Sequence, residues 1–197
     1  VHKMDNKISY PFFIVIFVYV KKIKNSVIKT DLHKKHPNKF IILMASRLTK
    51  EKNIPLAIKA MSEVVIKIKN ALLVIVGDGP EKNKLELQVS SYKSQDYVVF
   101  EPWSNDLTSY YKTADLFLLT SNYEGYGMTV VEATSANLPV VMTNVGVAVG
   151  AVSAVGNYKE VAHNIINLAE NKDIKNTVLQ SQKSLLNVYT SKENYLD

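Results

Sequence analysis

Short apolar runs alternate with longer segments of helical periodicity from Lys39 onward. A strand, a helix and another strand in succession need a crossover connection, so these strands are expected to be parallel neighbours in one sheet. The expected strands are Phe40–Met44, Ala71–Val76, Tyr97–Phe100, Leu116–Thr120 and Val140–Thr143. The expected helices are Ile54–Lys67, Glu81–Tyr92, Asp106–Thr113, Met128–Ala136, Tyr158–Glu170 and Lys172–Tyr189. The alternation therefore predicts an α/β protein.

The expected strands are apolar at nearly every position, as in the run Leu72–Val76. Such runs fit strands that are covered on both sides, because a half-exposed strand would alternate apolar and polar residues. The sheet is therefore expected to be doubly wound and to bind ligands at the carboxyl ends of its strands. Residues 39–170 are expected to form this domain, preceded by a basic linker over residues 1–38 and followed by a C-terminal helix over residues 171–197.

Positive charge is concentrated at the N-terminal end. Residues 1–40 hold nine Lys against Asp5 and Asp31, a net +7, which leaves −1 for the rest of the total of +6. Nucleic acid is not an expected partner, because residues 41–197 show no basic stripe with interleaved aromatic residues. The chain has no Cys, which excludes disulfides and thiol chemistry. The basic segment is either a solvated linker or a peripheral contact with an anionic membrane surface.

An apolar run occupies residues 12–20 within this basic segment. It is shorter than the ~20 residues that a membrane-spanning helix needs. Lys21 and Lys22 follow it, where a secretory signal would have small residues for cleavage. The run is therefore expected to be a buried strand.

The loop after the first expected strand carries Arg47, the only Arg of the chain, and Lys52. A planar guanidinium and an ammonium can together neutralise a pyrophosphate through charge-assisted hydrogen bonds. The alternative is a solvated charged loop.

The next two loops are less specific. Gly77-Asp-Gly-Pro80 suits a tight structural turn, with backbone contact to a nucleotide as the alternative. Trp103, the only Trp, follows the third expected strand. It either stacks on a nucleotide base or packs in the core.

The loop after the fourth expected strand gives the strongest signal. Glu124 and Glu132 are separated by seven residues, and Gly125 and Gly127 lie between them just before an expected helix. Glycines let the backbone approach a ligand, and the free amides of a helix start favour an anion. Because carboxylates accept hydrogen bonds from sugar hydroxyls, a nucleoside-diphosphate sugar would suit this arrangement. The alternative is a pair of surface glutamates around a flexible turn.

Taken together, these segments resemble the C-terminal domain of family 4 glycosyltransferases over about residues 39–148. The resemblance rests on Arg47 with Lys52, Val76–Pro80, Ala114–Ser121, Glu124 with Glu132 and Ala133, and Leu138–Val141. It implies a GT-B architecture of two Rossmann-like domains, in which this chain is the C-terminal, donor-binding half. It also implies transfer of a hexose from a UDP-, GDP- or ADP-sugar with retained anomeric configuration and no metal, in cytoplasmic polysaccharide or glycolipid biosynthesis.

Site roles follow from the resemblance residue by residue. It implies that Arg47 and Lys52 bind the diphosphate and stabilise the leaving group, that Glu132 binds the ribose and that Glu124 binds the transferred sugar. Backbone amides would add contacts from Gly125, Tyr126, Gly127, Met128 and Thr129. Glu124, Arg47 and Lys52 are the expected catalytic residues, and no Asp-x-Asp metal motif is found in the sequence.

The chain departs from the family pattern in three ways. The acceptor domain of the family is not found in these 197 residues, so the isolated chain is expected to be inactive without one supplied in cis or in trans. Asn137 replaces the glycine that usually precedes the next strand. Val149–Gly156 is expected to lead almost directly into the helix at Tyr158, which places the family's next strand in doubt. A non-catalytic nucleotide-sugar-binding remnant or module is the alternative function.

Overall fold

The computed structural model describes residues 20–125, 127–145, 152–154 and 157–190, and it contains one sheet of six strands. The strands are β1 (Phe40–Ala45), β2 (Ala71–Val76), β3 (Val98–Glu101), β4 (Leu116–Leu119), β5 (Val140–Thr143) and β6 (Val152–Ala154). All neighbouring strands pair in parallel, in the order β3-β2-β1-β4-β5-β6. The chain reverses direction across the sheet between β1 and β4, which makes their carboxyl ends the topological switch point where ligands bind in such folds. The expected Rossmann-like fold is confirmed.

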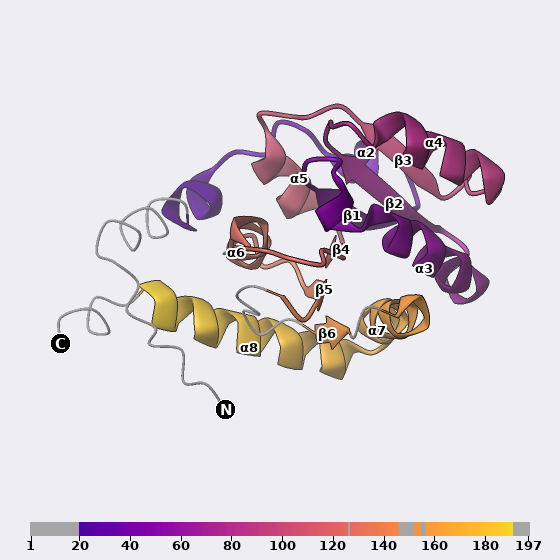
Figure 1. Cartoon of the computed structure of the whole chain (residues 1–197). Coiled ribbons are helices and arrows are strands. Elements are labelled where there is room, and N and C mark those ends of the chain that lie inside the picture. The colour runs from indigo at the N-terminus through magenta and orange to yellow at the C-terminus, as the bar shows by residue number, and fades with distance from the viewer. Residues whose placement is uncertain (1–19, 126, 146–151, 155–156, 191–197) are drawn as a thin grey trace.

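Helices cover both faces of the sheet. They are α2 (Leu32–Lys35), the short 3-10 helix η1 (Lys50–Lys52), α3 (Ile54–Lys67), α4 (Lys82–Ser91), α5 (Leu107–Thr113), α6 (Met128–Ser135), α7 (Tyr158–Glu170) and α8 (Lys172–Thr190). In Figure 1, α3, α4 and α7 lie to the right of the sheet, α5 and α6 lie to its left, and α8 runs beneath. The doubly wound arrangement gives the sheet a separate hydrophobic core on each face.

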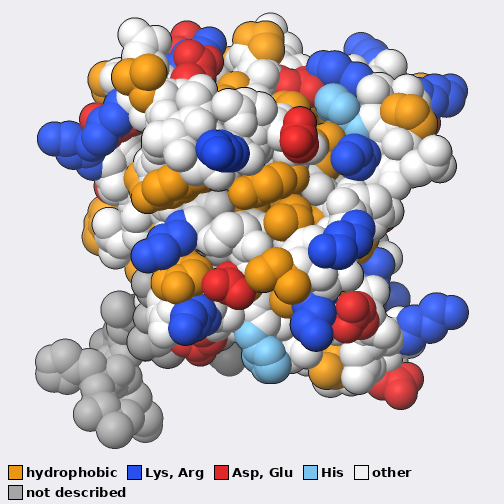
Figure 2. Space-filling view, turned by 90° about the vertical axis from the view of Figure 1, so that its right-hand side faces the viewer, with side chains coloured by type: hydrophobic (Ala, Val, Ile, Leu, Met, Phe, Trp, Pro, Cys, Tyr) orange, Lys and Arg blue, Asp and Glu red, His pale blue; other side chains and the backbone are white. Residues whose placement is uncertain are grey.

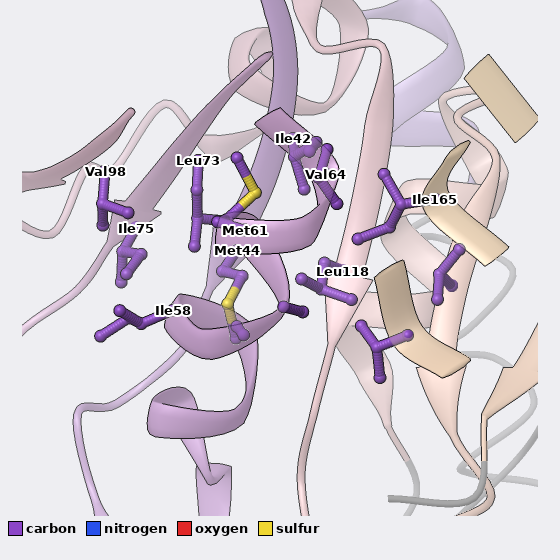
Figure 3. Packing of buried hydrophobic residues seen from close by; sticks show 14 of the residues in the cluster. Ile42, Met44, Ile58, Met61, Val64, Leu73, Ile75, Val98, Leu118 and Ile165 are labelled. Carbon is purple, nitrogen blue, oxygen red and sulfur yellow. The ribbon is translucent and has the colours of Figure 1, made fainter. Parts of the chain in front are cut away.

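Alternation along the strands distributes side chains between the two cores. In β1, Ile42 and Met44 point into the core beneath α3 and α7, whereas Ile41 and Leu43 point into the core beneath α5 and α6. Figure 3 shows the first core, in which β-strand side chains meet Met61 and other residues of α3. Because both sides of β1 are buried, its all-apolar sequence is explained.

Helix α8 joins the two faces. Val178 packs in the core beneath α3 and α7, and Leu186 packs in the core beneath α5 and α6, so α8 crosses below the sheet. Between them, the Gln182 side chain is 1% exposed. Its Nε2 donates to Leu138 O at 3.0 Å, and its Oε1 accepts from Val140 N at 3.1 Å. These bonds attach α8 to the corner between α6 and β5.

The segment before β1 packs on the domain. Residues 20–25 are helical, so a strand reaching Val20 is wrong, and residues 12–19 lie outside the described part of the chain. Leu32 is fully buried in α2, a helix that Asp31 caps by accepting from His33 N at 2.9 Å. Among the described residues, no helix is long and apolar enough to cross a membrane.

Two departures from the sequence expectation concern the C-terminal part of the sheet. The doubted last strand is present: Val152–Ala154 forms β6 and pairs with β5 in parallel. Asn137, which replaces the family glycine, has a φ of 61°. Asn is the residue that tolerates this left-handed conformation best after Gly, which explains how the chain keeps its turn into β5 without a glycine.

Candidate functional site

Two strand-end loops meet at the switch point of the sheet. Thr120, at the end of β4, donates through its Oγ1 to Lys52 O at 3.0 Å and to Asn53 O at 3.1 Å. Asn122 N donates to Glu51 O at 2.8 Å. Because these bonds tie the backbone of the loop after β1 to the loop after β4, the two loops form one framework for their side chains.

An ion pair spans this framework. Lys52 Nζ lies 2.6 Å from Glu124 Oε1, and the two side chains are 20% and 11% exposed. Ser121 Oγ donates to the same Glu124 oxygen at 2.6 Å, and Ser121 itself is fully buried. The structure therefore brings together a cation and a carboxylate that the sequence assigned to one cleft, although their direct contact was not expected.

The glycine turn after β2 supports the loop that carries Arg47. A Cβ on Gly77 would lie 1.9 Å from Ser46 O, so only glycine fits there. Leu48 N donates to Asp78 O at 2.9 Å. These contacts favour the structural-turn interpretation of Gly77–Pro80. The Arg47 side chain is exposed, and among the described residues it makes no ion pair within 4 Å, which leaves its guanidinium available to a ligand.

The glycine-rich loop leads into α6. A Cβ on Gly125 would meet no atom within 4 Å, so protein packing does not require a glycine there. Gly127 is the N-cap of α6 with a φ of 75°, and no side chain of the described residues caps the helix start. The first amides, of Met128 and Thr129, are therefore open to an acceptor such as a phosphate. Tyr126, also expected in the site, lies outside the described residues.

Glu132 lies in α6 beside a pocket of about 200 Å³. The pocket is also lined by Lys22, Trp103 and Tyr111. Trp103 is 53% exposed, which excludes the core-packing alternative and leaves its ring free to stack on a planar ligand. Trp103 and Glu132 thus share one pocket, as a nucleoside would require.

Tyr111 positions Glu132. Its hydroxyl donates to Glu132 Oε2 at 2.9 Å, and its buried ring packs edge-on against Phe117 at 5.5 Å between centroids. Burial raises the pKa of Glu132, while the Tyr111 hydrogen bond and the charge of Lys22 act against that rise. Burial, followed by the Glu132 charge, raises the pKa of Tyr111 well above its usual range, so Tyr111 remains a donor. Glu132 is therefore a fixed, partly desolvated acceptor.

A buried carboxylate ends β3 just before Trp103. Glu101 accepts from Lys35 Nζ at 2.6 Å and from Tyr110 OH at 2.7 Å. Burial acts to raise the pKa of Glu101, but these two hydrogen bonds hold it below its ordinary value. Since the carboxylate is satisfied by its partners, its role is to anchor α2 and the strand end that precedes the Trp103 loop.

Several side chains of this site were not predicted from the sequence. Among them, Tyr111 orients Glu132, and Ser121 holds Glu124. Ser121 could have been noticed because it directly precedes the glycine-rich loop at a strand end. Tyr111 gave no such signal, since a Tyr on the apolar side of a helix is ordinary core packing.

The described residues contain no group of three or more His, Asp or Glu side chains placed to hold a metal ion. Figure 2 shows the face of α3, α4 and α7, where Lys side chains are interspersed with acidic and apolar ones. That face is therefore not the basic stripe that nucleic acid would need.

Comparisons with known proteins identify the family to which this chain is similar. A family model described as "Glycosyl transferases group 1" matches residues 28–183. The chain is 33% identical over 107 residues to an alpha-monoglucosyldiacylglycerol synthase of Acholeplasma laidlawii, a match that covers 53% of this chain and 27% of the relative.

Solved structures show the same fold. The C-terminal domain of a glycosyl transferase group 1 family protein of Francisella tularensis, LpcC, superposes with a TM-score of 0.70 and 20% identity, over 83% of this chain and 92% of that one. Anabaena HepE, solved in complex with UDP and glucose, superposes with a TM-score of 0.72 and 20% identity, over 90% of this chain and 51% of that one. This chain thus spans about the length of the isolated LpcC domain and much less than the relative from Acholeplasma.

Proposed function

The chain belongs to the glycosyl transferases group 1 family, and from that premise we propose that it is a donor-binding domain for a nucleoside-diphosphate sugar. The observation that carries the proposal is the meeting of Lys52 and Glu124 across the loops at the switch point, next to the open start of α6. A cation, a helix start and a carboxylate in one place suit a diphosphate joined to a hydroxyl-rich group. The bound UDP and glucose of HepE support this choice of ligand class.

The site divides into two parts along such a ligand. Trp103 and Glu132 would hold the nucleoside, the ring against the base and the carboxylate on the ribose hydroxyls. Lys52, Arg47 and the amides at the start of α6 would hold the diphosphate, and Glu124 would accept from hydroxyls of the sugar.

The proposed chemistry depends on the diphosphate end. Transfer breaks the bond between the anomeric carbon of the sugar and a diphosphate oxygen, and that oxygen keeps the electron pair. Negative charge therefore develops on the leaving diphosphate, where preorganised cations and amides stabilise the transition state more than the ground state. In this proposal, Arg47 and Lys52 are the side chains that would do this.

The finer assignment is also a proposal. We propose a family 4, retaining hexosyltransferase that needs no metal and acts on a glycan or lipid-linked acceptor, with the acceptor domain supplied in cis or in trans. The name of the Acholeplasma relative, a glycolipid synthase, supports a lipid-linked acceptor. A divalent cation would be dispensable in this scheme, because two basic side chains and a helix start would together neutralise the diphosphate.

A non-catalytic binding module is the second candidate. Such a module would bind nucleoside diphosphates but would neither transfer nor hydrolyse the sugar when mixed with a cognate acceptor domain. Sugar transfer in that mixture would exclude it.

The test is a thermal-shift panel of UDP, GDP, ADP and their sugars on the 197-residue chain. One nucleotide series is expected to raise the melting temperature, because a ligand that binds only the folded state stabilises it. Arg47→Ala and Glu132→Ala should abolish the shift, whereas Lys50→Ala, which removes an exposed charge from the same loop, should retain it. A panel in which no nucleotide stabilises the chain would refute the proposal.

A further inference from the structure

We propose that Glu124 competes with the donor's diphosphate for Lys52, so that the site discriminates a nucleotide that carries a sugar from the same nucleotide without one. The inference rests on the proposed function, because it concerns the order in which one ligand engages the two side chains. It adds a specificity role to Glu124 that is separate from contact with the sugar.

The starting observation is that the two expected ligand-binding side chains bind each other in the described structure. Lys52 Nζ and Glu124 Oε1 are 2.6 Å apart, and both side chains are largely shielded from water. A charge-assisted bond of this length is stronger than a neutral one and is screened less by salt than a fully exposed pair. A diphosphate must therefore weaken this ion pair to use Lys52 fully.

Glu124 does not need Lys52 to keep its position. Ser121 Oγ donates to Glu124 Oε1 at 2.6 Å, and the Ser121 backbone oxygen accepts from Thr143 Oγ1, which anchors the loop to the end of β5. Both described partners of Glu124 contact the same oxygen, and no partner among the described residues bonds to Oε2. When Lys52 turns to a phosphate, the carboxylate remains beside the ligand and keeps its negative charge there.

The two forms of the nucleotide meet this charge differently. A nucleoside diphosphate without a sugar brings a second anion towards Glu124 and offers the carboxylate nothing in return. A nucleotide sugar places hydroxyl donors at the carboxylate, which replace the hydrogen bond lost from Lys52. Specificity then arises from an unfavourable contact for the wrong ligand as well as a favourable one for the right ligand.

The experiment is a double-mutant cycle on the 197-residue chain, with the nucleoside diphosphate and nucleotide sugar that give the largest thermal shift. Isothermal titration measures Kd for both ligands in wild type, Glu124→Gln, Lys52→Met and the double variant. Glu124→Gln is expected to bind the diphosphate about 5-fold more tightly than wild type, the ratio that corresponds to ~1 kcal/mol for a partly exposed ion pair. It should also lose most of the affinity that the sugar adds.

The Lys52→Met background tests the cause. If Glu124 acts largely by holding Lys52, the tightening by Glu124→Gln becomes much smaller when Lys52 is already Met. Tightening of undiminished size in that background would mean that charge repulsion alone accounts for it, and would overturn the inference. Glu51→Gln is the matched control, because it removes an exposed carboxylate from the residue next to Lys52, and it should change Kd less than Glu124→Gln.

The outcomes separate the inference from the proposed function. If wild type binds the diphosphate and Glu124→Gln binds it equally well or more weakly, the inference is overturned and the proposed function stands. Wild type that binds no nucleotide overturns the proposed function and the inference together.

Discussion

Replacing Tyr111 with Phe removes one buried oxygen atom and tests how Glu132 is held. The ring and its edge-on contact with Phe117 remain, so the change is confined to the hydroxyl that donates to Glu132 Oε2 at 2.9 Å. A hydrogen bond to an ionised group contributes about 1.5–3 kcal/mol, and one to a neutral group contributes about 0.5–1.5 kcal/mol. The free energy of unfolding is therefore expected to fall by the larger amount when Glu132 is a carboxylate.

The pH dependence gives the prediction its sign. Burial places the pKa of Glu132 above the usual 4.5, and Tyr111 acts against that rise. Removing Tyr111 raises the pKa of Glu132 further. When the pKa of a group is higher in the folded than in the unfolded state, the protein loses stability as pH rises through the folded pKa. The Tyr111→Phe variant, in which the pKa of Glu132 is raised more, therefore loses more stability than wild type as pH rises. The stability difference between the two proteins should therefore grow from about pH 4 to about pH 8.

Urea denaturation followed by circular dichroism at the two pH values measures this difference. Tyr123→Phe is the matched control: it makes the same chemical change on a side chain that is 71% exposed, and it should alter stability by less than about 0.5 kcal/mol. Equal effects of the two substitutions, or a Tyr111→Phe loss that grows towards low pH, would refute the assignment of Tyr111 as the residue that holds Glu132.

Two further predictions use matched pairs. Gly77→Ala should lower the melting temperature, because its Cβ would overlap Ser46 O. Gly125→Ala should leave the melting temperature unchanged and weaken nucleotide binding, since only a ligand would meet that Cβ. Melting temperatures measured with and without nucleotide distinguish the two effects. Val27 is an apolar side chain that is 77% exposed. If the basic N-terminal segment contacts an anionic membrane, Val27→Asp should reduce sedimentation of the protein with vesicles rich in anionic lipid, whereas Ile66→Asp on α3 should not. Equal losses for the two variants would contradict a membrane contact through the N-terminal segment.

The sequence predicted those parts of the fold that are long enough to show a period. All five strands and all six helices expected from Lys39 onward fall within one residue of their expected bounds at each end, because each has several turns or alternations of buried side chains, or clear flanking residues. Helix α2 and strand β6 were missed, since four and three residues contain too little pattern to distinguish a helix or strand from a loop.

The loops that form the candidate site were predicted from the sequence, but the contacts between their side chains were not. Strand order places the loops after β1 and β4 side by side, so Lys52 and Glu124 could be assigned to one cleft from the sequence. Their ion pair could not, because it depends on how Thr120 and Asn122 fix the two loops. Lys22 near Glu132 could not be foreseen either, since it arises from packing of a segment outside the strand pattern.

The attachment of α8 through Gln182 has a consequence for folding during synthesis. The amide of Val140 and the carbonyl of Leu138 are made more than forty residues before Gln182, the side chain that bonds to both. A nascent chain that has completed β5 therefore still has unsatisfied polar groups at that corner, which disfavour burial until the helix arrives. We therefore expect the corner between α6 and β5 to become stable only after Gln182 has been synthesised.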